Sequence, residues 1–190
     1  CAMRISLKFS LLVLLASCSE RPALDEATAL EKGQRIATAS FQVLSTRLST
    51  AMQAGGPAHA VEYCSLRALP LVDSISAAEG VRIKRTSDRL RAAHDAPDAD
   101  EARALAEMMK QWEQGGAPNV HADVRLLGDS VAYYQPIFIA SPTCLKCHGI
   151  AGQELDSAAH AVISERYPDD AATGYRLADL RGMWSIRWKR

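Results

Sequence analysis

The sequence predicts one α+β domain, with helices in the first part of the chain and a mostly antiparallel sheet in the rest. Three observations indicate this class. Apolar residues recur at helical spacing from residue 24 to about residue 80, apolar and polar residues alternate in later segments, and Gly128-Asp129 separates two of these segments as a hairpin turn does. The 190 residues, 48% of them apolar, suffice for one domain with a core and are short for two.

Two long helices are predicted first. The first carries one buried stripe and runs from about residue 24 to Gln53; the stripe consists of Leu30, Ile36, Phe41, Val43, Leu44 and Leu48. Gly55-Gly56-Pro57 ends this helix, and Pro57 suits the first turn of the next, which ends near Gly80. Pro70 lies inside the second helix and is expected to kink or split it.

The later elements are read from alternation and from turn residues. Segments whose side chains alternate are expected to be strands, and they span residues 81–86, 120–127, 130–140 and 183–188. Two further segments favour helices, at residues 98–114 and 153–166. Two segments are expected to be loops, at residues 87–97 and 141–149.

Charge and the first residues limit the class of protein. The 22 basic residues balance 22 acidic ones, and removing residues 1–17 leaves 20 against 22, so no basic nucleic-acid footprint is present. Arg4 and Lys8 precede an apolar run that is too short to span a bilayer, as in a secretory signal. We therefore expect an exported domain that binds no nucleic acid.

The leader resembles a bacterial lipoprotein signal because Leu15-Ala16-Ser17-Cys18 resembles a lipobox. Such a signal predicts a leader at 1–17, a lipidated tether at 18–24 and the domain at 25–190. Acyl chains on Cys18 would anchor the protein to a membrane, and Ser19 favours the periplasmic face of a Gram-negative outer membrane. The alternative is an ordinary secretory signal with a chance cysteine.

The motif that carries chemistry is Cys144-Leu145-Lys146-Cys147-His148, a C-x-x-C-H sequence typical of c-type haem attachment. Two thiols at this spacing can each add to one haem vinyl group, and the adjacent imidazole can bind the iron. A structural zinc site would need two further ligands, and the sequence holds neither a second C-x-x-C nor an H-x-x-x-H. A redox-active thiol pair and a plain disulfide remain alternatives.

One axial position of the iron is then open, and cysteine counting favours Cys64 for it. Cys18 is assigned to lipid, Cys144 and Cys147 to haem, and Cys1 lies before the predicted cleavage point. A leftover thiol in an oxidising compartment is a liability unless it is buried or liganded, so a buried structural cysteine is the alternative. The other candidate ligands are His59, His94, His121, His160, Met52, Met108, Met109 and Met183.

Five other side chains are candidates for the haem pocket. Arg85, Arg89 and Arg91 suit the two haem propionates, because guanidinium groups bind carboxylates bidentately. Tyr134 and Phe138 are candidates for the haem wall. Each has an ordinary alternative, since charged loops are usually solvated and aromatic residues in a strand usually belong to the core.

Several motifs occur in an order that makes a resemblance specific. Besides the C-x-x-C-H-G segment and a cysteine in the second helix, they are Arg85-Thr86-Ser87, Tyr134-Gln135-Pro136-Ile137-Phe138, Tyr167-Pro168-Asp169-Asp170, Ala172-Thr173-Gly174-Tyr175 and Leu180-Arg181-Gly182. Over residues 28–188 the chain resembles a c-type haem family long described as a domain of unknown function. That family includes a cyanobacterial member with a PAS-like fold and the sensor part of some histidine kinases.

The resemblance implies a PAS-like antiparallel sheet flanked by helices, one covalent haem c, and an axial pair that maps onto His148 and Cys64. Two departures concern the pocket rim. Gln135 stands where the family usually has Lys or Arg, and Arg91-Ala92-Ala93-His94 replaces a stretch that tends to hold an Arg-Asn-Pro run.

A thiolate ligand stabilises ferric iron, and a six-coordinate iron leaves no vacant position for substrate. We therefore expect a membrane-anchored monohaem cytochrome, not an enzyme, that exchanges electrons at low potential with a redox partner protein. The alternative is a redox or gas sensor in which loss of Cys64 opens the iron to NO or CO; it ranks second because no signalling output segment accompanies the domain here. A second alternative is a non-redox ligand-binding lipoprotein.

Overall fold

The computed structural model describes residues 24–190, so the predicted signal at 1–17 and the lipidation site Cys18 lie outside the described residues. Its elements are α1 (Glu26–Glu79), β1 (Arg82–Thr86), α2 (Ala99–Gly115), β2 (Asp123–Leu127), β3 (Ser130–Phe138), α3 (Pro142–His148), α4 (Ser157–Arg166) and β4 (Leu180–Lys189). Short 3₁₀ turns occupy Ala93–Asp95 and Ala117–Asn119. The predicted α+β class is confirmed.

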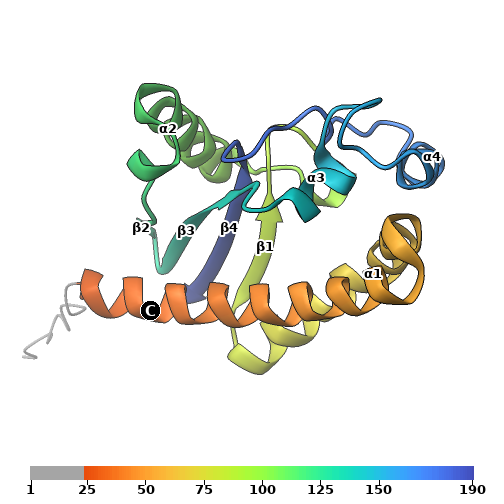
Figure 1. The fold of residues 1–190 in the computed structure, drawn as a ribbon. Helices are drawn as coiled ribbons and strands as arrows, with labels where there is room; N and C mark the ends of the chain where they lie inside the picture. The colour runs from red at the N-terminus through yellow and green to blue at the C-terminus, as the bar shows by residue number, and fades with distance from the viewer. Residues whose placement is uncertain (1–23) are drawn as a thin grey trace, which may run out of the picture.

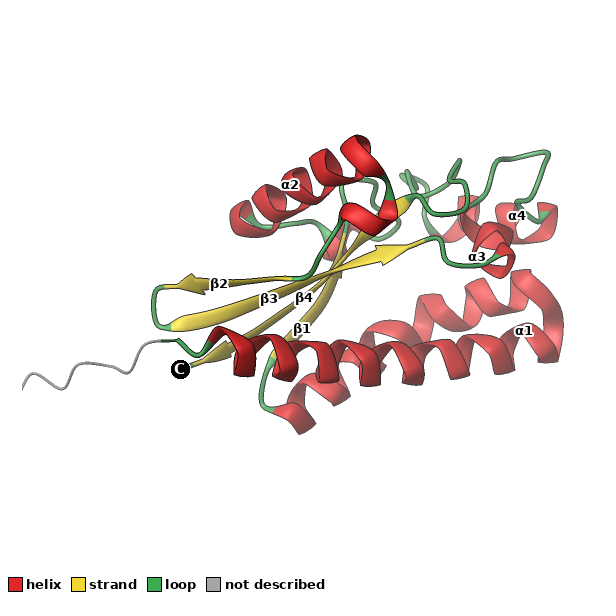
Figure 2. Cartoon of the chain, turned by 60° about the vertical axis from the view of Figure 1, so that its left-hand side comes forward, coloured by secondary structure: helices red, strands yellow, loops and turns green. Residues whose placement is uncertain are grey.

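The four strands form one antiparallel sheet in the order β1-β4-β3-β2 (Figure 1). The last strand, β4, therefore lies in the interior of the sheet, where it pairs with β1 on one side and β3 on the other. Helix α1 covers one face and α2 the other, while α3 and α4 lie together at one end of the sheet (Figure 2). Among residues 24–190, no helix combines the length and the apolarity that a membrane crossing requires.

Helix α1 consists of two arms, as the glycine pair predicts. Gly55 and Gly56 have non-helical backbone angles, and Gly56 has φ +74°, a conformation that favours glycine. The second arm returns along the first, and the Arg35–Glu79 ion pair of 2.8 Å joins the two arms. The expected split at Pro70 is wrong, because non-helical angles occur in α1 only at the glycine pair. Pro70 is exposed, so water can satisfy the carbonyl that loses its partner.

Each face of the sheet has its own core. A Cβ on Gly33 of α1 would lie 2.1 Å from Cγ of Tyr133, so the helix backbone packs directly on that ring. The cluster between α1 and the sheet contains Ile36, Ala37, Val72, Ile83, Tyr133, Trp184 and Ile186. The cluster beneath α2 contains Ala104, Leu105, Met108, Val120, Ala132, Tyr134, Leu180 and Met183. Successive residues Tyr133 and Tyr134 thus serve opposite faces, as strand alternation requires.

Several elements differ from the sequence predictions, and α4 begins at Ser157 where residue 153 was expected. Residues 142–148 form a helix where a loop was expected. The sequence did not predict this helix because so short a segment shows no helical periodicity of apolar residues. The last strand begins at Leu180, three residues earlier than expected. The sequence did not predict these three residues as strand because Leu180-Arg181-Gly182 does not alternate apolar and polar side chains. Strand β2 begins at Asp123, and Val120 instead packs beneath α2.

Two carboxylates at the start of α2 tie this helix to the sheet. Asp98 accepts from the N–H of Glu101, and the Glu101 carboxylate accepts from the N–H of Asp98, which makes a capping box. The Glu101 side chain is fully buried and lies 2.9 Å from Lys84 Nζ and 3.1 Å from Arg82 Nη2. Asp98 lies 2.8 Å from Arg187 Nη1 on β4. The network joins α2 to both β1 and β4.

Replacing Asp98 with asparagine keeps an oxygen that can cap α2 but removes the negative charge paired with Arg187, so it should destabilise the domain at pH 7 by about 1 kcal/mol. Burial acts to raise the pKa of Asp98, but the Arg187 hydrogen bond and nearby positive charge lower the pKa from 3.8 to about 2. Because the folded pKa lies below the unfolded one, this stability is present above about pH 4 and is lost as the pH falls toward about 2.

Urea unfolding of the wild type and of Asp98→Asn at pH 7 and pH 3 measures this contribution. The variant should lose less stability between the two pH values than the wild type does. Asp169→Asn serves as the control, because Asp169 is exposed and lies outside the capping network of α2. Its stability should depend on pH as that of the wild type does. Equal losses in wild type and Asp98→Asn would contradict the prediction.

Candidate functional site

The C-x-x-C-H motif forms α3, and the surrounding sequence starts and stops this helix. Pro142 occupies the first turn, where its missing N–H breaks no helical bond, and the Cys144 N–H donates to the Ser141 carbonyl at 3.0 Å. At the other end, the Gly149 N–H donates to the Leu145 carbonyl at 2.8 Å. A Cβ on Gly149 would lie 2.6 Å from that oxygen, so glycine is required. The helix holds both thiols and the imidazole within little more than one turn.

The imidazole of His148 has a fixed orientation. Its Nδ1 lies 2.7 Å from the carbonyl oxygen of Ala172, so Nδ1 carries the proton and donates, and Nε2 keeps its lone pair. Burial lowers the pKa of His148 well below 6.5, and the charges of nearby arginines lower it further against the opposing effect of the Ala172 hydrogen bond. These arginines are Arg91, Arg181 and Arg85. Neutral imidazole with a free Nε2 lone pair is the form that binds a metal.

The segment after α4 lies against α3 and completes the surroundings of His148. The Tyr175 N–H donates to the His148 carbonyl at 2.9 Å, and the Gly174 N–H donates to the Gly149 carbonyl at 2.8 Å. The Tyr175 ring also meets the imidazole edge to face, with centroids 6.2 Å apart. Cys144 packs against an apolar cluster that this segment shares with α3, made of Ile139, Leu145, Ala172 and Tyr175.

Arg91 joins α3 to the same segment. Its Nη2 donates to the carbonyl of Cys147 at 2.7 Å and to that of Ala172 at 3.2 Å, and its Nε lies 2.9 Å from the Asp170 carboxylate. The two charged side chains are 15% and 7% exposed, so this ion pair is largely removed from water. The guanidinium predicted as a propionate partner is therefore engaged by protein acceptors.

Cys64 lies in the second arm of α1, where this arm packs against α4. Val61, one helical turn earlier, belongs to an apolar cluster against which Cys147 packs; its other members are Leu155, Ala159 and Ile163. The fold thus brings the face of α1 that carries Cys64 to the second cysteine of the motif, across more than eighty residues of sequence.

The three cysteines of the described chain are free thiols, each partly buried. Burial raises the pKa of Cys64, while the charges of Arg85 and Arg91 lower it. Burial also raises the pKa of Cys147 to about 11, with Arg91 acting against this rise and the neighbouring Cys64 adding to it. The packing of Cys147 against the cluster that contains Val61, and the hydrogen bond from Arg91 to the Cys147 carbonyl, place these groups in one site.

Four arginines surround this site, and only Arg91 forms an ion pair within residues 24–190. Arg89 donates from Nε to the Ala171 carbonyl at 3.0 Å, and its guanidinium lies 4.1 Å from the centre of the Tyr175 ring. The Arg181 guanidinium lies 5.4 Å from the same ring, and burial lowers the pKa of this group. Arg85, the fourth, acts on both His148 and Cys64. The site therefore carries an excess of positive charge.

Two polar atoms beside this cluster are buried without a hydrogen-bond partner in the described chain, namely the Tyr175 hydroxyl and Arg181 Nε. Buried polar atoms are nearly always paired in folded proteins, so an orphaned pair at one place suggests a bound group that the protein alone does not supply. The excess of guanidinium groups indicates that this group carries carboxylates or similar anions.

Other predicted pocket residues lie elsewhere. Tyr134 packs beneath α2, and its hydroxyl accepts from Arg187 at 3.2 Å, so the fold does not bring it to His148. Phe138 packs against the same α2 cluster, although the next residue, Ile139, lies in the cluster around Cys144. Of the alternative axial ligands, Met108 and Met183 are in the α2 core, Met109 packs against it, and all four other histidines are exposed.

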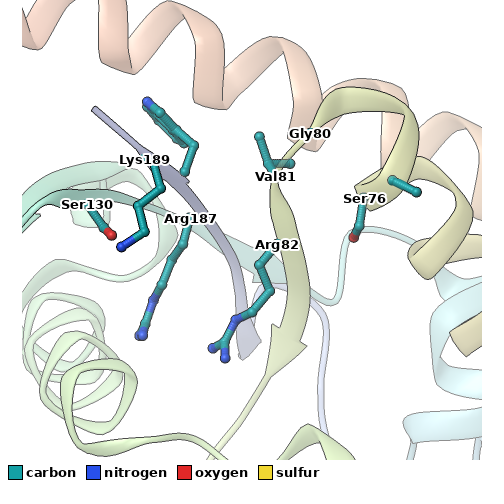
Figure 3. A pocket seen from close by; sticks show the side chains of 9 residues that line it. Ser76, Gly80, Val81, Arg82, Ser130, Arg187 and Lys189 are labelled. Atoms are coloured by element: carbon teal, nitrogen blue, oxygen red, sulfur yellow. The ribbon is translucent and has the colours of Figure 1, made fainter.

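Of two cavities in the described chain, one lies away from this site and the other shares Arg85 with it. One of about 540 Å³ lies at the opposite end of β1 and β4 from α3, between the end of α1 and the sheet (Figure 3). Its cationic side chains, Arg82, Arg187 and Lys189, are already paired with carboxylates. A second cavity of about 260 Å³ lies between α1 and β1 and is lined in part by Leu69, Val72 and Arg85. Within the described chain, no group of three or more His, Cys, Asp or Glu side chains is placed to hold a metal ion.

The fold and the site define an α+β domain with a C-x-x-C-H helix at one end of its sheet. The family model described as Tll0287-like matches residues 21–188, and the chain belongs to the Tll0287-like family. A solved structure titled as the cyanobacterial heme-protein Tll0287 has the same fold, with a TM-score of 0.63 and 24% sequence identity over 86% of this chain and 96% of that one. No curated protein matches the chain. The predicted family resemblance is confirmed.

Sequence reasoning assigned no role to several residues of the site. Asp170, Ala172, Tyr175 and Arg181 each stand in a motif that carried the family resemblance, but their types and spacing name no partner. Ala172 acts through its backbone carbonyl, which side-chain patterns cannot reveal. One signal could have pointed to them: three of the motifs follow one another within residues 167–182, and a loop segment rich in such motifs is often part of a functional site.

Proposed function

We propose that the chain holds one haem covalently, as a c-type monohaem protein, through Cys144, Cys147 and His148. Each cysteine thiol adds its S–H across one vinyl C=C bond, so a C–S and a C–H bond form and no oxidant is consumed. The observation that carries the proposal is the His148 Nδ1 hydrogen bond to Ala172, because it leaves Nε2 free in a helix whose two thiols are spaced for attachment.

The surrounding residues fit such a group. Haem brings two propionate carboxylates, and the site offers three guanidinium groups that form no ion pair in the described chain, on Arg85, Arg89 and Arg181. The orphaned Arg181 Nε and Tyr175 hydroxyl are donors of the kind that a carboxylate satisfies. Arg85 therefore keeps its proposed role, and Arg181 and Tyr175 join it. Arg89 already donates to the carbonyls of Ala171 and Thr173, so we propose that it acts on a propionate through its charge.

We propose Cys64 as the second axial ligand. It is a partly buried thiol on the face of α1 that meets Cys147, and positive charge from Arg85 and Arg91 acts on it. Burial raises the pKa of Cys64 and so disfavours the thiolate, the form of cysteine that binds iron, while this positive charge favours it. Binding to a ferric iron would supply the remaining stabilisation. The methionines of the α2 core and the exposed histidines offer weaker alternatives.

The function we propose is electron transfer at low potential. A covalently held haem supplies one iron that accepts a single electron from a donor protein and passes it to an acceptor protein. A His148/Cys64 pair would hold the iron without a vacant position, so the chain would act as a carrier and not as an enzyme. The leader at 1–17 and Cys18 support an exported, lipid-anchored protein at the periplasmic face of the outer membrane of a Gram-negative cell.

Sensing is the second candidate, and the position of Cys64 favours it. The second arm of α1 packs on α4 and on β1, so release of Cys64 from a ligand would free a helix that contacts both the site and the sheet. Binding of a diatomic gas at the vacated position would then be reported by α1. Electron transfer ranks first because it needs no movement of this helix.

The test is a spectrum of the protein matured in a periplasm. Haem staining of a denaturing gel should be positive, and the ferric spectrum should be of the thiolate-ligated, low-spin type. Reduction with dithionite followed by CO separates the two functions, because uptake of CO requires that Cys64 leave the iron. A stain that is negative would overturn the proposal of covalent haem, and a spectrum typical of His/Met ligation would remove Cys64 from the iron.

A further inference from the structure

One carbonyl oxygen in the site accepts two hydrogen bonds from groups with different roles. The Ala172 oxygen accepts from His148 Nδ1 at 2.7 Å and from Arg91 Nη2 at 3.2 Å. Ala172 itself is fully buried, so water does not compete for this oxygen. The strength with which the carbonyl accepts from the imidazole therefore depends on what Arg91 does.

Arg91 is held in place from three directions. The Asp170 carboxylate lies 2.9 Å from Arg91 Nε and 3.4 Å from Nη2, and it also accepts from the Ala172 N–H at 3.3 Å. The Cys147 carbonyl accepts from Nη2 at 2.7 Å. Because the ion pair is largely buried, water screens the attraction between its two charges only weakly. The Arg91–Asp170 ion pair is thus joined by hydrogen bonds to two carbonyls, that of Ala172 and that of Cys147.

This ion pair has a chemical consequence at the imidazole. A guanidinium that donates to a carbonyl oxygen draws on its lone pairs and makes it a weaker acceptor for a second donor. A weaker bond at Nδ1–H leaves the imidazole less like an imidazolate, so Nε2 donates less strongly to a metal. A less strongly donating ligand stabilises ferric iron less, which raises the reduction potential.

We propose that Arg91, anchored by Asp170, is a positioning residue that sets the ligand strength of His148 through the shared Ala172 carbonyl. This inference rests on the proposed function, in which His148 binds the iron of a covalent haem. Removing the guanidinium while keeping its charge should strengthen the Nδ1–H bond and lower the potential, by a tenfold change in the reduction equilibrium, or about 59 mV.

The test compares Arg91→Lys, Asp170→Asn and a control in the full matured protein. Lysine keeps the positive charge, but its single ammonium group cannot donate to Asp170, Cys147 and Ala172 at once, as the planar guanidinium does. Asp170→Asn keeps the guanidinium but removes its anchor, and it provides a second variant should Arg91→Lys fail to fold. Arg103→Gln, an exposed position on α2 whose side chain is paired with Asp100, controls for a distant change of charge.

Two readouts are used. The Nδ1–H proton resonance of His148 in the diamagnetic ferrous protein should move downfield in Arg91→Lys and in Asp170→Asn, and it should stay in place in Arg103→Gln. The midpoint potential of Arg91→Lys should fall relative to the wild type. A wild-type resonance and a wild-type potential in Arg91→Lys would overturn the inference.

Haem staining keeps this result separate from the proposed function. If the wild type stains and Arg91→Lys behaves as the wild type, the inference fails and the haem proposal stands. If the wild type does not stain, the haem proposal fails, and the resonance in the haem-free chain alone decides whether Arg91 acts on the imidazole. An unmoved resonance there overturns the inference as well.

Discussion

Replacing Cys144 and Cys147 together with alanine should abolish covalently bound haem. Each thiol is the only atom of its side chain that can form a thioether, and no other described cysteine lies in α3. The single variants should each keep one bond and stain more weakly. We expect the loss to be complete in the double variant, since His148 alone gives a coordinate bond that denaturation breaks.

The measurement is haem staining of a denaturing gel, with the mass of the intact protein as a second readout. Thr143→Ala, at an exposed position in the same helix, is the matched control and should stain as the wild type does. Staining of the double variant at the wild-type level would contradict covalent attachment at this motif. The fold should survive in either case, because both core clusters that flank the sheet lie outside α3.

Replacing Cys64 with alanine should leave haem attached and change the iron. Without a thiolate the ferric spectrum should become high-spin or take on a different low-spin form. The potential should rise by a substantial part of the roughly 0.8 V range that axial ligands control. The change is large because an anionic donor is lost from a partly buried site.

Spectroelectrochemistry of the matured variant measures both effects. Ser65→Ala is the matched control, since Ser65 neighbours Cys64 on α1 and only bonds the backbone of its own helix. Its spectrum and potential should equal those of the wild type. An unchanged ferric spectrum in Cys64→Ala would exclude this cysteine from the iron and direct attention to the methionines.

Much of the fold follows from local signals. The glycine pair at 55–56 and the turn at 128–129 are strong because each demands a backbone conformation that few other residues adopt. Pro70 misled because the cost of a helical proline depends on whether its freed carbonyl reaches water, which sequence does not say. Helix α3 was missed because its stabilising contacts are a capping proline and a close-packed glycine, with no apolar stripe.

The site divides in the same way. The motif at 144–148 could be found because attachment chemistry fixes its spacing, and Cys64 could be suspected because cysteines can be counted. Tyr134 and Phe138 were predicted as pocket residues, yet both pack beneath α2, because strand alternation does not tell which face holds the site. The role of Arg91 could not be predicted, since it depends on two backbone carbonyls brought together from distant segments.

The interior position of β4 has a consequence for the order in which this protein matures. Its partner β1 lies about a hundred residues earlier, as the pairing of Arg82 with Arg187 shows, so the sheet closes only when the last strand is available. In the export that we propose, which starts from the N-terminus, residues 144–148 would leave the membrane before β4 does. The two thiols would therefore be accessible as an open segment before Arg181, at the start of β4, completes the arginine cluster around them. In the proposed c-type protein, covalent attachment would then come early, and the arginine cluster around the iron would be assembled last.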